Sequence, residues 1–143
     1  MTKVKQLEIC NYSLVLSGIV VLASSMQLEA TGSVGIIPVR IHIIAAFMFC
    51  GLVFYHIYLH FNRSNWFGSF SKMKCKATKV LWWLFNLTVV SGLIALTEWL
   101  IHSCHTPIGG IHGKIGFVML FIALGHTLKR RKFFCTKSKG TQP

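Results

Sequence analysis

Four long apolar stretches constrain the fold of this sequence more than any other feature. They cover residues 9–28, 39–61, 80–101 and 111–128. Each is long enough, at about 1.5 Å of rise per helical residue, to cross about 30 Å of hydrocarbon. The chain is also 53% hydrophobic and only 13% charged, which is too apolar for an ordinary soluble domain of 143 residues. We therefore expect an all-α integral membrane protein, with four transmembrane helices forming a single membrane domain.

The positive charges predict how these helices are oriented. The net charge is +12, but the cations cluster between the apolar stretches and not along one polar face, so we expect no nucleic-acid partner. All but two of the 15 Lys and Arg residues lie before the first stretch, between the second and third, or after the fourth. The exceptions are Arg40 and Lys114. The positive-inside bias then predicts an N-in/C-in topology with a basic cytoplasmic tail over 129–143.

Helix-breaking residues mark the two connections expected on the outer side. Pro38 lies where the second helix should start, a position that tolerates the missing N–H. Thr106-Pro107 and Gly109-Gly110 are expected to form a turn before the fourth helix.

An internal repeat relates the two halves of the chain. Pairs of similar residues recur at an offset of 70 between the second and fourth stretches, and a Ser-Gly pair recurs at an offset of 74 between the first and third. The repeat predicts an up-and-down four-helix bundle built from two related hairpins. The matching positions are Ile41-His42 with Ile111-His112, Phe47 with Phe117, His56 with His126, and Ser17-Gly18 with Ser91-Gly92.

Four of the seven histidines lie inside the apolar stretches as two equally spaced pairs. His42 and His56 are 14 residues apart on the second stretch, and His112 and His126 are 14 apart on the fourth. Because 14 residues are two heptads, both members of a pair keep to one helix face. Ionisable side chains are costly inside a membrane. We therefore expect these histidines to be functional and to face the bundle interior.

The second and fourth helices should run in the same direction, which brings the histidines to two matched depths. His42 with His112 form what we name the outer pair, and His56 with His126 the inner pair, about 21 Å away at 1.5 Å per residue. Two facing imidazoles suit a haem iron, which takes its other ligands from the macrocycle. Zinc would need three or four protein ligands at one depth. The alternative is that the histidines only form hydrogen bonds between helices.

Other histidines leave alternatives open. His60 is four residues beyond His56 and shares its helix face, so it is an alternative ligand at the inner level. We favour His56 because it preserves the spacing with His126. His102 and His105 lie in the outer connection, where flexible loop residues are the simpler interpretation and a peripheral metal site the other.

Four further residues are second-rank candidates for cofactor binding. Arg40 and Lys114 each lie two residues from an outer histidine, and could pair with the carboxylates of a haem edge or extend to the membrane interface. Gly18 and Gly92 lie near the middle of the first and third stretches, where a missing side chain would let a flat macrocycle approach. Small residues also favour ordinary helix packing.

These residues give the sequence a resemblance to the b-type cytochrome superfamily. In the cytochrome b of respiratory bc complexes, two parallel helices each carry the H-x13-H pattern, and related four-helix cytochromes are membrane subunits of hydrogenases and formate dehydrogenases. The pattern is matched here by His42, His56, His112 and His126. Gly18 and Gly92 resemble the glycines that flank haems in that group. In size and layout the chain looks closest to the small bacterial flavinylation-associated cytochromes.

The resemblance implies cofactors, partners and a location. The cofactors would be two non-covalent haem b groups, and the location the bacterial inner membrane. The function would be electron transfer between a quinone pool or cytoplasmic donor and an extracytoplasmic redox protein. The chain could act as a homo- or hetero-oligomer, or as a subunit of an oxidoreductase. Two alternatives stay open, namely haem or metal binding and transport, and a membrane anchor subunit of a larger redox complex.

Overall fold

The computed structural model describes residues 3–60, 76–103 and 106–137, and all of its regular elements there are helices. Each of the four helices contains a segment long and apolar enough to cross a membrane. The predicted all-helical class with four membrane-length helices is therefore confirmed for the described part of the chain. The helices are α1 (Lys3–Ala30), α2 (Ile36–His60), α4 (Lys76–His102) and α5 (Pro107–Lys137).

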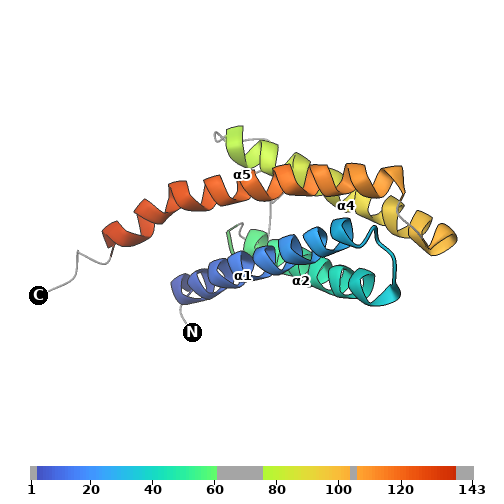
Figure 1. Cartoon of the computed structure of the whole chain (residues 1–143). Helices are drawn as coiled ribbons and strands as arrows, with labels where there is room; N and C mark the ends of the chain where they lie inside the picture. Colours follow the sequence, from blue (N-terminus) through green and yellow to red (C-terminus); the bar gives the residue numbers. More distant parts are fainter. Residues whose placement is uncertain (1–2, 61–75, 104–105, 138–143) are drawn as a thin grey trace, which may run out of the picture.

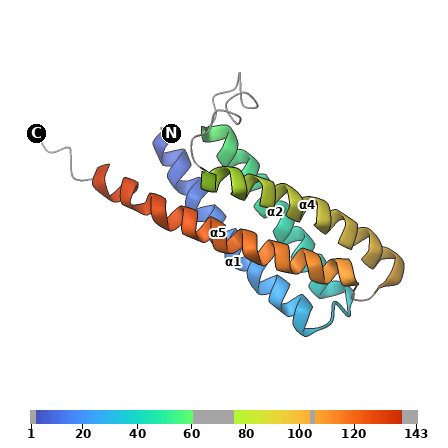
Figure 2. The same ribbon diagram turned by 90° about the horizontal axis from the view of Figure 1, so that it is seen from above.

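Helix α5 extends well beyond the predicted span. It continues to Lys137 and so includes most of the basic segment that the sequence analysis assigned to a tail. Lys and Arg are good helix formers, so nothing in this segment stops the helix. Figures 1 and 2 show the C-terminal part of α5 extending past the start of α1.

Helix α1 ends in a hydrogen-bonded cap that begins the first turn. The amide of Ser33 donates to the Leu28 carbonyl at 2.9 Å, and the amide of Gly32 donates to the Glu29 carbonyl at 3.2 Å. This is the Schellman pattern, which needs a left-handed residue after the helix. Gly32 provides it with a φ of 59°. Pro38 then lies within the first turn of α2, where its missing N–H leaves no helical bond unmade.

Helix α5 starts earlier than the sequence suggested. Thr106 is its N-cap, because the Thr106 Oγ1 accepts a hydrogen bond of 3.2 Å from the amide of Gly109. Pro107 is the first helical residue, the position at which proline is most readily accepted. The prediction that Gly109 and Gly110 lie in a turn before the helix was therefore wrong, since both belong to its first turn.

The Thr106 cap should be measurable as a stability effect. Replacing Thr106 with alanine should lower the free energy of unfolding by about 1 kcal/mol, since an orphan amide at the helix start loses its acceptor. Thr97→Ala is the matched control, because the Thr97 hydroxyl donates to the Ile94 carbonyl within α4 and caps nothing. Reversible denaturation in mixed detergent micelles would compare them. Equal losses for the two variants would contradict the cap.

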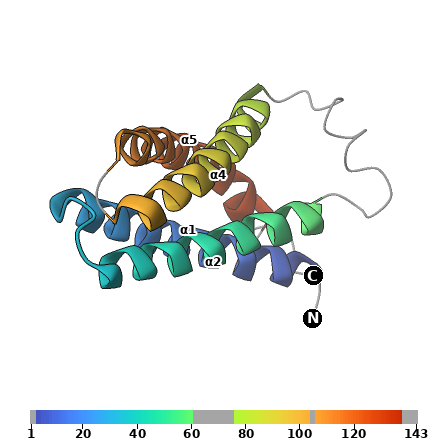
Figure 3. The ribbon, with the colours of Figure 1, turned by 90° about the vertical axis from the view of Figure 1, so that its right-hand side faces the viewer.

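The four helices form two antiparallel hairpins. Helix α1 packs along α2, and α4 packs along α5, while α1 and α5 make the main contact between the hairpins. Figure 3 shows the hairpins as two layers, one above the other. The start of α1 and the end of α5 lie at one end of the bundle and the α1–α2 turn at the other, which we name the turn end. The predicted two-hairpin layout is present in the structure.

The bundle has a small core and a large apolar surface. The buried apolar side chains among the described residues are Cys10, Val39, Ala45, Leu59, Phe85 and Met119. No described side chain is fully buried, and many large apolar side chains are exposed on all four helices. Such surfaces are stable only against an apolar medium or further apolar groups.

Candidate functional site

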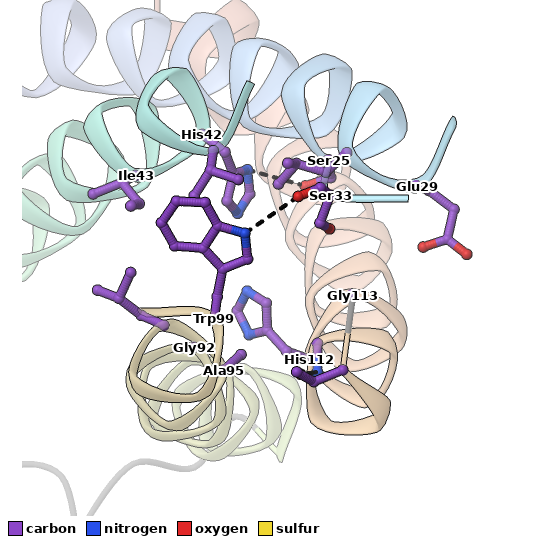
Figure 4. A pocket seen from close by; sticks show the side chains of 15 residues that line it. Ser25, Glu29, Ser33, His42, Ile43, Gly92, Ala95, Trp99, His112 and Gly113 are labelled. Atoms are coloured by element: carbon purple, nitrogen blue, oxygen red, sulfur yellow. Dashed lines mark hydrogen bonds between the residues drawn. The ribbon is translucent and has the colours of Figure 1, made fainter. Parts of the chain in front are cut away.

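The outer pair meets across the bundle near the turn end. His42 on α2 and His112 on α5 have ring centroids 6.2 Å apart and ring planes inclined at 75°. Figure 4 shows the two rings pointing toward one another between the hairpins. Both side chains are half-buried. The structure therefore brings together the two histidines that the sequence assigned to one depth.

A serine holds each ring of the outer pair. The Ser24 Oγ on α1 lies 3.0 Å from the Nδ1 of His42, and the Ser91 Oγ on α4 lies 3.2 Å from the Nδ1 of His112. Both serines are buried. Each histidine is thus held by the other helix of its own hairpin, through the same ring nitrogen. This leaves Nε2 of each ring as the nitrogen available to a ligand or metal.

Gly92 lets the His112 ring take its position. A Cβ added at Gly92 would lie 2.8 Å from Cε1 and 3.2 Å from Nδ1 of His112. Real side chains do not approach this closely, so any residue larger than glycine would move the ring. The space beside Gly92 is thus taken by the His112 ring, and the approach of a macrocycle to this glycine stays a prediction. Gly18 differs from Gly92. A Cβ added at Gly18 would lie 3.7 Å from the Phe49 side chain and 3.8 Å from the Leu120 side chain, and neither neighbour is a histidine.

A cavity of about 120 Å3 adjoins the outer pair on the side of the turn end. Both histidines line it, together with small residues of α4 and α5, and with Trp99, whose Nε1–H donates to the Ser33 carbonyl at 3.2 Å. The cavity is larger than a water molecule needs but smaller than a typical pocket for a cofactor. The small residues that line it are Gly92, Ala95, Gly109 and Gly113.

The donor set of this site suits a haem iron. A metal bonded to two opposed imidazole nitrogens at about 2 Å would hold the ring centroids about 6 Å apart, close to the observed 6.2 Å. The described residues contain no group of three or more His, Cys, Asp or Glu that could hold a metal ion. Two imidazoles alone match the axial positions of haem. The donor atoms therefore suit a haem iron, whereas the cavity of about 120 Å3 is smaller than the macrocycle.

The inner pair is less well defined. His56 on α2 and His126 on α5 are both half-buried. The ring contact that the structure gives for His56 is with His60, at a centroid distance of 4.6 Å and an angle of 57°. Helix α1 contacts α2 near His56 through the buried Cys10, whose Sγ lies 3.8 Å from the Leu52 carbonyl. Ligation of a second haem by the inner pair stays a prediction, and so does the choice between His56 and His60.

The remaining candidates lie at the surface. Arg40 and Lys114 are exposed, as is His102 at the end of α4. The structure brings none of these three into the cavity beside the outer pair. His105 lies outside the described residues. A role for Arg40 and Lys114 at a haem edge stays a prediction.

Sequence reasoning missed the serine that holds His42. The repeat matched Ser91 with Ser17, whereas the residue that plays the part of Ser91 in the first hairpin is Ser24, seven residues further along α1. The Ser17 hydroxyl donates to the Leu14 carbonyl in its own helix. Ser24 could have been found from the antiparallel pairing of α1 and α2. Folding α1 back along α2 around the turn places this part of α1 opposite His42.

Comparison with known proteins gave no further assignment. The chain matches no family model, no curated protein and no solved structure with significant similarity. The geometry of the site is therefore the basis for a function.

Proposed function

We propose that this chain carries electrons across a bilayer through two b-type haems, each held by two histidines. The outer pair would bind one haem and the inner pair the other. The observation that supports the proposal most strongly is the opposed arrangement of His42 and His112, whose rings are 6.2 Å apart and whose Nδ1 atoms each lie beside a serine hydroxyl. Metal-ligating histidines typically make a hydrogen bond through the ring nitrogen that does not bind the metal, because this bond orients the ring.

The protein's own contribution is to position the ligands and exclude water. Two hairpins of apolar helices surround the histidines, and the serines fix the rings of the outer pair. Gly92 leaves space beside His112, where its missing Cβ avoids a contact of 2.8 Å. When bound, each haem would supply reversible one-electron chemistry at its iron. The apolar faces of the four helices would be covered by lipid.

The proposed location is the bacterial inner membrane, and the charges support an orientation with both termini in the cytoplasm. The start of α1 and the end of α5 share one end of the bundle, and described cations on three helices lie toward that end. In this topology the cavity beside the outer pair faces the extracytoplasmic side. An extracytoplasmic redox protein would then exchange electrons with the outer haem, and a quinone or a cytoplasmic donor with the inner one. The cations are Lys3, Lys5, Lys76, Lys79 and Lys129.

Reconstitution in closed vesicles would test the function. Purified protein is placed in liposomes that contain ferricyanide, and dithionite is added outside with an uncoupler and a potassium ionophore to relieve charge build-up. We expect each electron from external dithionite to reduce one internal ferricyanide, at a rate well above that of protein-free liposomes. Haem that is bound but fails to conduct, and that exchanges with external apo-acceptors, would favour haem transport instead.

The assignment of the inner ligand leads to a separate prediction. His56→Ala should remove the inner haem and halve the haem content, because one of the two histidines that would hold it is gone. His60→Ala should leave both haems bound, since His60 is exposed. Haem content per chain and reduced-minus-oxidised spectra would measure both variants. The reverse result would assign the inner ligand to His60.

A further inference from the structure

Ser24 makes two polar contacts that together restrict where its hydroxyl proton lies. Its Oγ is 3.0 Å from the Nδ1 of His42 and 2.9 Å from the backbone carbonyl of Val21. Ser24 is buried, with 5% of its surface exposed. A neighbouring hydroxyl, that of Ser25, lies 3.5 Å from the same Nδ1 and 2.9 Å from the same carbonyl.

Ser91 repeats this arrangement in the second hairpin. Its Oγ lies 3.2 Å from the Nδ1 of His112 and 3.1 Å from the backbone carbonyl of Thr88. Ser91 is also buried, at 9% exposed. A carbonyl, a hydroxyl and an imidazole therefore occur on both sides of the outer pair, and His112 also has a hydrogen bond to the Thr88 backbone.

The order of these groups assigns the protons. A carbonyl can only accept a hydrogen bond, and a serine hydroxyl has one proton and two lone pairs. If the hydroxyl donates to the carbonyl, its lone pair can accept from an N–H at Nδ1, and both contacts become hydrogen bonds. If Nδ1 carried no proton, the single hydroxyl proton would have to choose between two acceptors. Buried polar groups favour the arrangement with every contact satisfied.

We propose that Ser24 and Ser91 are positioning residues that hold both rings of the outer pair as Nδ1–H tautomers, and thereby lower the reduction potential of the outer haem. The tautomer leaves the lone pair of Nε2 free on each ring. Donation from Nδ1–H to the serine makes the imidazole a more basic ligand, which favours the ferric state of the iron. The effect on the potential depends on the proposed function, whereas the tautomer does not.

Substitution of the serines would test the effect on the potential. Ser91→Ala should shift the midpoint potential of one haem to a more positive value and leave the other unchanged. Ser91→Thr, which keeps the hydroxyl, should restore the original value. Ser24 is replaced together with Ser25, because Ser25 offers His42 a second hydroxyl. We expect the double alanine variant to shift the same haem in the same direction.

Ser17→Ala is the matched control for these variants. The Ser17 hydroxyl donates to the Leu14 carbonyl at 3.2 Å, so it makes the same bond within its helix but has no histidine beside it. It should leave both potentials unchanged. An equal shift in Ser17→Ala, or no shift in Ser91→Ala with haem fully bound, would overturn the inference about the potential.

Nuclear magnetic resonance of histidine labelled with 15N would test the tautomer separately. The spectrum is recorded on the full-length chain in detergent without haem, because iron bound at Nε2 would by itself leave the proton on Nδ1. His42→Gln and His112→Gln variants assign the two signals. We expect a proton on Nδ1 of both rings, and a proton on Nε2 of either ring would refute the inference. A chain that carries both Nδ1–H tautomers but binds no haem would refute the proposed function alone.

Discussion

Replacing His112 with alanine should reduce the haem content of the purified protein from about two per chain to about one. His112 faces His42 across the bundle, with their ring centroids 6.2 Å apart, and a non-covalent haem held by this pair would lose one of the two side chains that bind it. His42→Ala should give the same loss. Haem content by the pyridine haemochrome assay and reduced-minus-oxidised spectra would measure both.

The control for these variants is His102→Ala, because His102 is exposed at the end of α4 and takes no part in the outer pair. It should retain both haems. The double variant His42→Ala with His112→Ala should lose no more haem than either single variant, since both act on one site. If the double variant lost both haems, or if either single variant kept both spectral components, the assignment of these histidines to one haem would be wrong.

Replacing Gly92 with alanine should also remove the outer haem or convert it to a different spin state. The added Cβ would lie 2.8 Å from Cε1 of His112, so the ring must turn away from its position opposite His42. Alanine is a better helix former than glycine by about 1 kcal/mol, and so α4 itself should not be weakened. The expected result is a folded protein with a defective outer site, measured by haem content and by electron paramagnetic resonance of the ferric form.

Gly51→Ala provides the comparison for Gly92→Ala. Gly51 lies within α2, and a Cβ added there meets no other heavy atom within 4 Å. This variant should keep two low-spin haems. Both changes add the same methyl group to a helix. A difference between the haem spectra of the two variants would therefore come from the contact of the added Cβ with His112. Indistinguishable spectra for the two variants would contradict the part assigned to Gly92.

The sequence contained enough information to predict the helices and the outer pair. Apolar stretches of membrane length can satisfy their backbone groups in lipid only as helices or closed barrels, so the four helices followed directly. The equal spacing of His42 and His56 with His112 and His126 identified two candidate depths. The outer pair is closest to the turn end, and there the expected meeting of rings is found.

The helix ends and the serines were harder to predict. Thr106 and Pro107 suggested a turn, although the same residues are also a good N-cap and first helical residue, and tertiary context decides between the two. Ser24 was missed because the internal repeat matches Ser91 with Ser17 by sequence alone. The contact between Ser24 and His42 depends instead on how α1 folds back along α2. The inner pair lies far from the turn, where small differences in helix direction change which side chains meet.

The most direct test of the central claim is the haem content of the unmodified protein. The chain is purified in detergent from membranes of haem-replete cells, and its pyridine haemochrome and reduced-minus-oxidised spectra are recorded. The account predicts a red protein with about two non-covalent b haems per chain, both low-spin. A folded protein that is colourless under these conditions would contradict it.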